Sequence, residues 1–67
     1  QNLVYPRQIA MHICRQLTSS SLPVIGKMFG GRDHSTVIHS LKLIEQKMKT
    51  SVEVNTTIET IVRRVQG

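Results

Sequence analysis

The chain has 67 residues, which is enough for one small domain with a modest core and too few for two. It has no apolar run near the ~20 residues of a membrane span and no charged-then-apolar leader. Its single cysteine, Cys14, can form neither an internal disulfide nor a thiolate metal site. We therefore expect a soluble cytoplasmic protein.

The net charge of +5 is unevenly distributed. Residues 1–51 hold seven Lys or Arg against two acidic residues, whereas residues 52–67 hold two of each. A basic excess on a small domain often indicates a polyanionic partner, but a merely solvated basic face is the alternative. Charge alone leaves both interpretations open.

We predict a first helix from Pro6 to Leu17. Ile9, Ile13 and Leu17 recur every four residues, which places them on one apolar face beside Ala10 and Cys14. A proline suits the first turn of a helix, because the N–H it lacks would be unpaired there. Cys14 is interpreted as a small core residue rather than a nucleophile.

A short second helix is predicted from Leu22 to Phe29, with Ser21 as its N-cap. Its inward residues are expected to be Ile25, Met28 and Phe29. Gly26 in the middle costs ~1 kcal/mol of helix stability relative to alanine. We therefore expect another helix to cross closely at Gly26.

The third predicted helix starts at Asp33 or His34 and runs to about Lys49. Helical periodicity gives it an apolar face of Val37, Leu41, Ile44 and Met48. The opposite face is polar and free to meet a partner: Ser35, His39, Lys42 and Gln46. Leu43 falls on this polar side and is expected to be exposed.

The last segment is also predicted to be helical, with Asn55 as its cap. Its apolar stripe would be Ile58, Ile61, Val62 and Val65, and Arg63-Arg64 would form a solvated end. Val52 and Val54 are also compatible with a short strand, but a single strand would have no partner strand. The predicted fold class is all-α, with about four helices in a single domain.

The segment Gly30 to Thr36 joins a glycine turn to the start of a helix. Paired glycines permit positive φ and an abrupt turn, so the second and third helices form a helix-turn-helix. Arg32 could make two parallel hydrogen bonds to guanine, and Asp33 could accept one from cytosine N4. Taken alone, however, this pair is more typical of a surface turn and an N-cap.

The decapeptide from Gly30 to His39 resembles the signature of the C-terminal DNA-binding domain, domain IV, of the bacterial replication initiator DnaA family. The resemblance covers about Pro6 to the end of the chain. It implies a helix-turn-helix domain that binds double-stranded DNA at the nonameric DnaA boxes of replication origins and some promoters. It also implies a nucleoid-associated protein of the bacterial cytoplasm.

The resemblance assigns roles by position in the motif. The base-contacting positions are Arg32, Asp33, His34 and Ser35. The phosphate-contacting positions, several of them acting through backbone N–H groups, are Arg7, Gln8, Arg15, Ser19, Ser20, Ser21, Leu22, Pro23, Thr36 and His39.

This sequence departs from the family pattern in two respects. Ser35 stands where many members have threonine, which puts a methyl contact to thymine in doubt. The chain begins after the family's upstream helix and basic loop, and it lacks the nucleotide-binding domain. We therefore expect no minor-groove arginine, no ATP and no other cofactor.

Other function classes compete with DNA binding. A helical interaction module could dock a protein on the exposed face that includes Leu43, and regulatory proteins could share the DNA-binding surface; the chain itself is expected to be monomeric. An enzyme is the weakest option, because no nucleophile–base set or phosphate loop is present. His34 and His39 lie about 140° apart around a helix, so they cannot ligate one metal from the same face.

Overall fold

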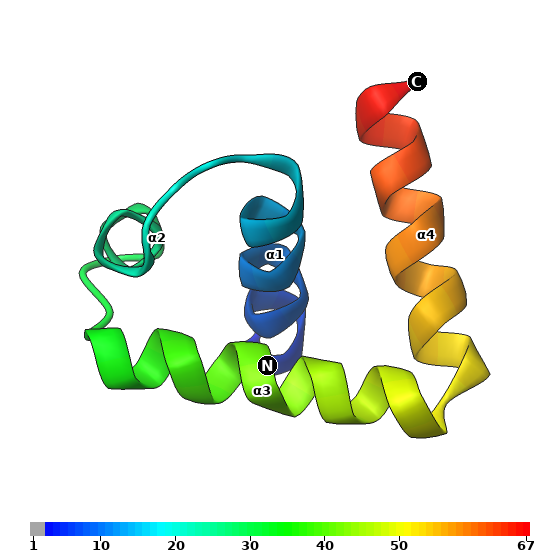
Figure 1. The fold of residues 1–67 in the computed structure, drawn as a ribbon, viewed down its shortest axis with the longest axis horizontal. Coiled ribbons are helices and arrows are strands. Elements are labelled where there is room, and N and C mark those ends of the chain that lie inside the picture. Colours follow the sequence, from blue (N-terminus) through cyan, green and yellow to red (C-terminus); the bar gives the residue numbers. More distant parts are fainter. Residues whose placement is uncertain (1–2) are drawn as a thin grey trace.

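The computed structural model describes residues 3–67, which form four α-helices (Figure 1). These are α1 (Val4–Leu17), α2 (Leu22–Met28), α3 (His34–Thr50) and α4 (Val52–Gln66). No strand occurs in this part of the chain, so the all-α prediction with about four helices is confirmed. Helix α3 forms the base of the fold, and α1 and α4 rise from it at steep angles (Figure 1).

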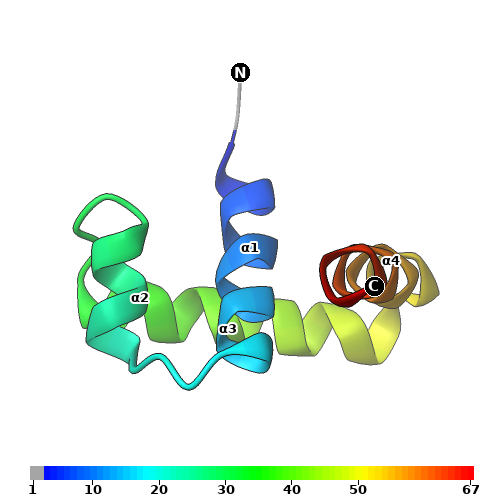
Figure 2. The same cartoon turned by 90° about the horizontal axis from the view of Figure 1, so that it is seen from above.

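Helix α1 lies between α2 and α4 in both views (Figure 2). This central position gives α1 two buried sides. Ile9 and Ile13 pack with Ile44 of α3 and Ile58 of α4. A second cluster, on the side of α2, is formed by Met11, Ile25 and Val37.

The single apolar face predicted for α1 was incomplete, because Met11 is 1% exposed and was not predicted to be buried. A residue two positions from Ile9 and Ile13 points to a nearly opposite side of a helix. Helix α1 also begins at Val4, two residues before the predicted start, so Pro6 lies within the first turn as expected.

Helix α2 starts where the sequence predicted, because the Oγ of Ser21 accepts a hydrogen bond from the N–H of Val24 at 3.4 Å. Ile25 is fully buried, and the half-buried Phe29 packs against the same cluster. Met28 is 54% exposed, so its predicted inward position was wrong. Phe29 itself follows the last helical residue as the C-cap.

Gly26 is buried against the turn that follows α2. The N–H of Arg32 donates to the carbonyl of Gly26 at 2.8 Å, and a Cβ added to Gly26 would collide with the backbone oxygen of Arg32. The expected close crossing of two helices was therefore only partly right. The nearest neighbour is the turn backbone, and α3 contributes the Val37 side chain at 3.5 Å from the added Cβ position.

Helix α3 begins at His34 with Asp33 as its N-cap, in agreement with the sequence. Val37 and Ile44 are fully buried, and Leu41 and Met48 are half-buried against the two clusters. The predicted polar face of Ser35, His39, Lys42 and Gln46 is exposed. Leu43 is half-buried, which corrects its predicted exposure.

Helix α4 is capped by Ser51, whose Oγ accepts from the N–H of Val54 at 3.2 Å. Asn55, the predicted cap, lies inside the helix and donates from its side-chain amide to the carbonyls of Met48 and Ser51. Asn55 therefore satisfies carbonyl groups around the end of α3 rather than N–H groups of α4.

The predicted apolar stripe of α4 was right only in part. Ile58 is buried and Val62 is half-buried, but Ile61 is 37% exposed and Val65 is 67% exposed. The C-terminal end of α4 stands apart from α1 in Figure 1, which explains why its last apolar residue has no core to join. Arg63 and Arg64 are exposed, as expected.

Candidate nucleic-acid interface

The turn between α2 and α3 fixes the position of Arg32. Gly30 and Gly31 have φ values of 87° and 75°, in the left-handed region that favours glycine. The chain then returns toward α2, where the N–H of Arg32 bonds to Gly26. The Nε of Arg32 donates to the carbonyl of Phe29 at 3.1 Å. One edge of the exposed guanidinium is thus tied to the turn, and its terminal Nη groups remain available for a ligand.

Asp33 is an N-cap and an exposed acid at the same time. Its Oδ1 accepts a hydrogen bond from the N–H of Ser35 at 2.8 Å, which satisfies one orphan donor at the start of α3. A carboxylate has a second oxygen, which can accept from a ligand. The N-cap interpretation and the base-contact interpretation of Asp33 are therefore compatible.

The first turn of α3 presents its side chains to solvent. His34, Ser35 and Thr36 are exposed, and their side chains form no hydrogen bond within the described residues. Together with Arg32 and Asp33 they form an exposed polar segment at the N-terminal end of α3. We call this segment, residues 32–36, the recognition turn. All four predicted base-contacting residues lie on it.

A hollow of about 350 Å³ lies between α1 and α3, beside the recognition turn. It brings together five predicted contact residues that lie far apart in the sequence, namely Arg7, Gln8, Arg32, Thr36 and His39. Gln8 is only 9% exposed, so little of its side chain can reach a ligand. We call this the α1–α3 hollow. Its basic groups are Arg7 and Arg32, with His39 beside them.

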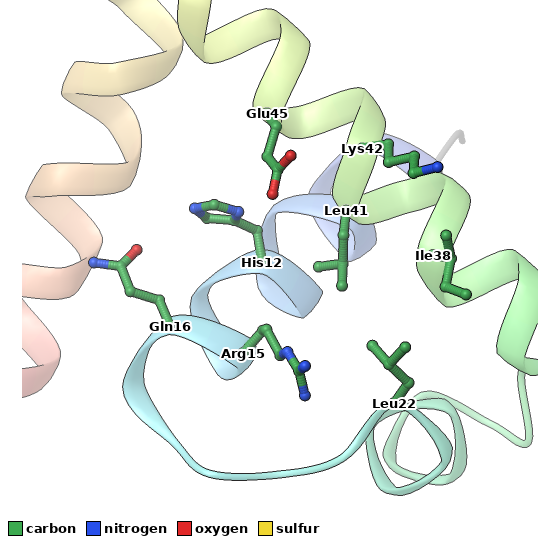
Figure 3. A pocket seen from close by; sticks show the side chains of 8 residues that line it. All are labelled: His12, Arg15, Gln16, Leu22, Ile38, Leu41, Lys42 and Glu45. Atoms are coloured by element: carbon green, nitrogen blue, oxygen red, sulfur yellow. The ribbon is translucent and has the colours of Figure 1, made fainter.

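A second hollow of about 350 Å³ lies between α1, α2 and α3, and Figure 3 shows its lining side chains. It contains two further predicted phosphate-contacting residues, Arg15 and Leu22. Lys42 of α3 also lines it, and Glu45 and His12 point toward each other at the end away from Leu22 (Figure 3). We call this the α1–α2–α3 hollow. The predicted contacts are therefore divided between two hollows rather than gathered in one.

The remaining predicted contacts lie in the loop before α2 and in its first turn. Ser19, Ser21 and Pro23 are exposed, and Ser20 is half-buried. The hydroxyl of Ser21 is already engaged in capping α2. This loop borders the second hollow through Leu22 and through a hydrogen bond from Arg15 to Ser20.

Sequence reasoning placed Lys42 on the polar face that is free to meet a partner but did not name it as a contact residue, although Lys42 adds a second positive charge to the α1–α2–α3 hollow. Its position four residues after Ile38, on the same side of α3, was a signal that could have placed the two together. Thr18 was likewise missed, because its contribution is a set of hydrogen bonds inside the loop.

Among residues 3–67, no group of three or more His, Cys, Asp or Glu side chains is placed to hold a metal ion. No helix in the same part of the chain is long and apolar enough to cross a membrane.

The short α2, the glycine turn and the longer α3 with its exposed first turn define a helix-turn-helix protein. A family model described as the bacterial DnaA protein helix-turn-helix matches residues 1–44, and the chain belongs to this family.

Curated relatives agree with this assignment. The chain is 49% identical over 65 residues to the chromosomal replication initiator protein DnaA of Geotalea uraniireducens, covering 97% of this chain and 14% of that protein. It is 48% identical over 67 residues to the DnaA protein of Geotalea daltonii, covering 100% of this chain and 15% of the relative. It is 52% identical over 59 residues to that of Geobacter metallireducens, covering 88% and 13%. The chain therefore spans about one seventh of the length of these relatives.

Proposed function

We propose that residues 1–67 form one DNA-binding domain that recognises DnaA boxes in double-stranded DNA, at a replication origin, for the initiation of chromosome replication. Boxes within promoters would give the same domain a role in transcriptional regulation. The observation that carries this proposal is the recognition turn, which a helix-turn-helix presents to the major groove. The family to which the chain belongs supports it.

The recognition turn would supply the sequence reading. The Nη groups of Arg32 can bond to guanine O6 and N7, while the bond from Nε to Phe29 limits the directions in which the guanidinium can point. The free carboxylate oxygen of Asp33 can accept from cytosine N4. His34 and Ser35 can reach neighbouring base edges.

The two hollows would supply the phosphate contacts. Thr36 and His39 lie on the side of α3 toward the α1–α3 hollow, whereas Ile38 and Lys42 lie toward the α1–α2–α3 hollow. A recognition helix in the major groove has a phosphate backbone on each side. The cations that flank α3, Arg7 and Arg15 among them, would therefore contact the two strands and set the orientation of the domain.

We further propose that the domain acts as a monomer in the bacterial cytoplasm, in association with the nucleoid. Regulatory proteins could share part of the DNA-binding surface. The half-burial of Leu43 argues against an apolar docking face as the main function, because this side chain is not fully available on the surface.

The proposal is tested by replacing Arg32, with Arg63→Ala as the matched control. Arg63 is an exposed cation in the last turn of α4, outside both hollows beside α3. We expect Arg32→Ala to cost ~1–3 kcal/mol of binding free energy on a box-containing duplex and much less on random DNA. Arg63→Ala should change neither discrimination nor folding. Equal losses on both duplexes for Arg32→Ala would reduce Arg32 to a phosphate contact and contradict base reading.

A further inference from the structure

Several side-chain hydrogen bonds hold the loop between α1 and α2. The hydroxyl of Thr18 donates to the carbonyl of Cys14 at 2.7 Å and accepts from the N–H of Ser20 at 3.2 Å. The hydroxyl oxygens of Thr18 and Ser20 lie 3.0 Å apart. These contacts fold the loop back against the last turn of α1.

Arg15 also bonds to this loop. This exposed side chain belongs to the last turn of α1, and its Nη1 donates to the carbonyl of Ser20 at 2.7 Å. Ser20 is therefore bonded through its N–H to Thr18 and through its carbonyl to Arg15. The backbone N–H and the backbone carbonyl of Ser20 are thus both hydrogen-bonded, one residue before the Ser21 cap of α2.

We propose that Arg15 is a positioning residue, which holds the loop of residues 18–21 in the conformation that contacts DNA. This inference rests on the proposed DNA-binding function, because Ser19, Ser20 and Ser21 matter here as phosphate contacts. A loop that is ordered before binding loses less conformational entropy when it binds. The role of Arg15 in this loop is distinct from the contribution of its charge.

The chemistry of arginine permits both roles. A guanidinium has five N–H donors in a rigid plane, and the bond to Ser20 uses one of them. The remaining donors can reach a phosphate at the rim of the α1–α2–α3 hollow. A purely electrostatic role would require no fixed partner inside the protein.

The test compares Arg15→Met with the control Lys42→Met. Each variant removes one positive charge from the same hollow, but Lys42 makes no hydrogen bond to the loop in the described structure. The first readout is amide hydrogen exchange of residues 18–22 in the free protein. We expect faster loop exchange in Arg15→Met, on the order of 2- to 10-fold, which corresponds to the loss of one net hydrogen bond. Lys42→Met should exchange like the parent.

The second readout is a double-mutant cycle on box affinity. Thr18→Val removes the other attachment of the loop while preserving its shape and charge. If Arg15 acts through the loop, the combined loss of affinity will be smaller than the product of the two single losses. If Arg15 is only a phosphate contact, the losses will multiply. Unfolding curves of all variants verify that each remains folded.

The outcomes separate this inference from the function on which it rests. Normal box binding by the parent, combined with unchanged loop exchange in Arg15→Met or with multiplying losses, overturns the positioning role alone. A parent domain that does not distinguish the box from random DNA overturns the proposed function, and the role of the loop in binding falls with it. Faster loop exchange in Arg15→Met, together with a combined affinity loss smaller than the product of the single losses, supports both the positioning role and the proposed function.

Discussion

Replacing Gly26 with alanine should destabilise the domain, although the same change in an ordinary helix stabilises it. Alanine normally gains ~1 kcal/mol over glycine inside a helix. At this position the new Cβ would meet the backbone oxygen of Arg32, and the N–H of Arg32 is simultaneously bonded to Gly26. The neighbour is a hydrogen-bonded backbone rather than the flexible end of a side chain, so it cannot move without breaking the turn.

Overpacking of this kind costs roughly 1–3 kcal/mol and occasionally more, and a backbone clash belongs at the upper end. After the gain in helix propensity, we expect a net loss of about 1–2 kcal/mol. For a domain of this size the midpoint of thermal unfolding should fall by about 4–16 °C. Discrimination between DNA duplexes should fall as well, because the displaced backbone is that of Arg32.

Circular dichroism melts of Gly26→Ala and of the exposed neighbour variant Lys27→Ala provide the assay. Lys27→Ala should stay within about 0.5 kcal/mol of the parent. If Gly26→Ala were more stable than the parent, the close approach of the turn to α2 would be refuted.

Two further substitutions test the helix caps. Asp33→Ala should lower the free energy of unfolding by about 1 kcal/mol, because the hydrogen bond from the Ser35 N–H is lost. Asp33→Asn should retain most of the parent's stability. Equal stability of the alanine variant and the parent in urea unfolding would rule out this cap. Ser51→Ala should cost about 1 kcal/mol by the same mechanism at the start of α4. An unchanged urea midpoint for Ser51→Ala would contradict its role as the cap.

Local sequence rules were sufficient for the helix-turn-helix. Ser21 was predicted as a cap, and Asp33 was among the candidates for the cap of α3, because a cap depends on a side chain and an N–H two or three residues later. The glycine turn was recognised because positive φ at Gly30 and Gly31 is a local requirement. These features position the recognition turn. The base-contacting and phosphate-contacting roles of its residues came from the family resemblance and stay predictions.

The errors occurred at residues whose burial or hydrogen bonding depends on how a neighbouring helix is placed. Met11 is buried because α1 lies between two helices, and periodicity within α1 favoured only one side. Val65 is exposed because α4 extends beyond the core, although its spacing fits the apolar stripe. Asn55 has the chemistry of a cap but finds carbonyl groups at the end of α3 instead.

The division of the predicted phosphate contacts between two hollows was also inaccessible to the sequence. The family resemblance named Arg7 and Arg15 without placing them relative to α3. The structure puts Arg7 in the α1–α3 hollow and Arg15 in the α1–α2–α3 hollow, because eight residues, about two turns of α1, separate the two along the helix. The bond from Arg15 to the loop depends on how the chain turns after Leu17.

The most direct test of the central claim is fluorescence anisotropy of this chain with a duplex carrying the DnaA-box consensus and with a scrambled duplex, at two salt concentrations. We predict tighter binding to the box at both concentrations, with affinity for both duplexes falling steeply as salt rises, because phosphate contacts release counterions. Equal affinity for the two duplexes, or binding that salt does not weaken, would contradict sequence-specific recognition of DNA by this helix-turn-helix.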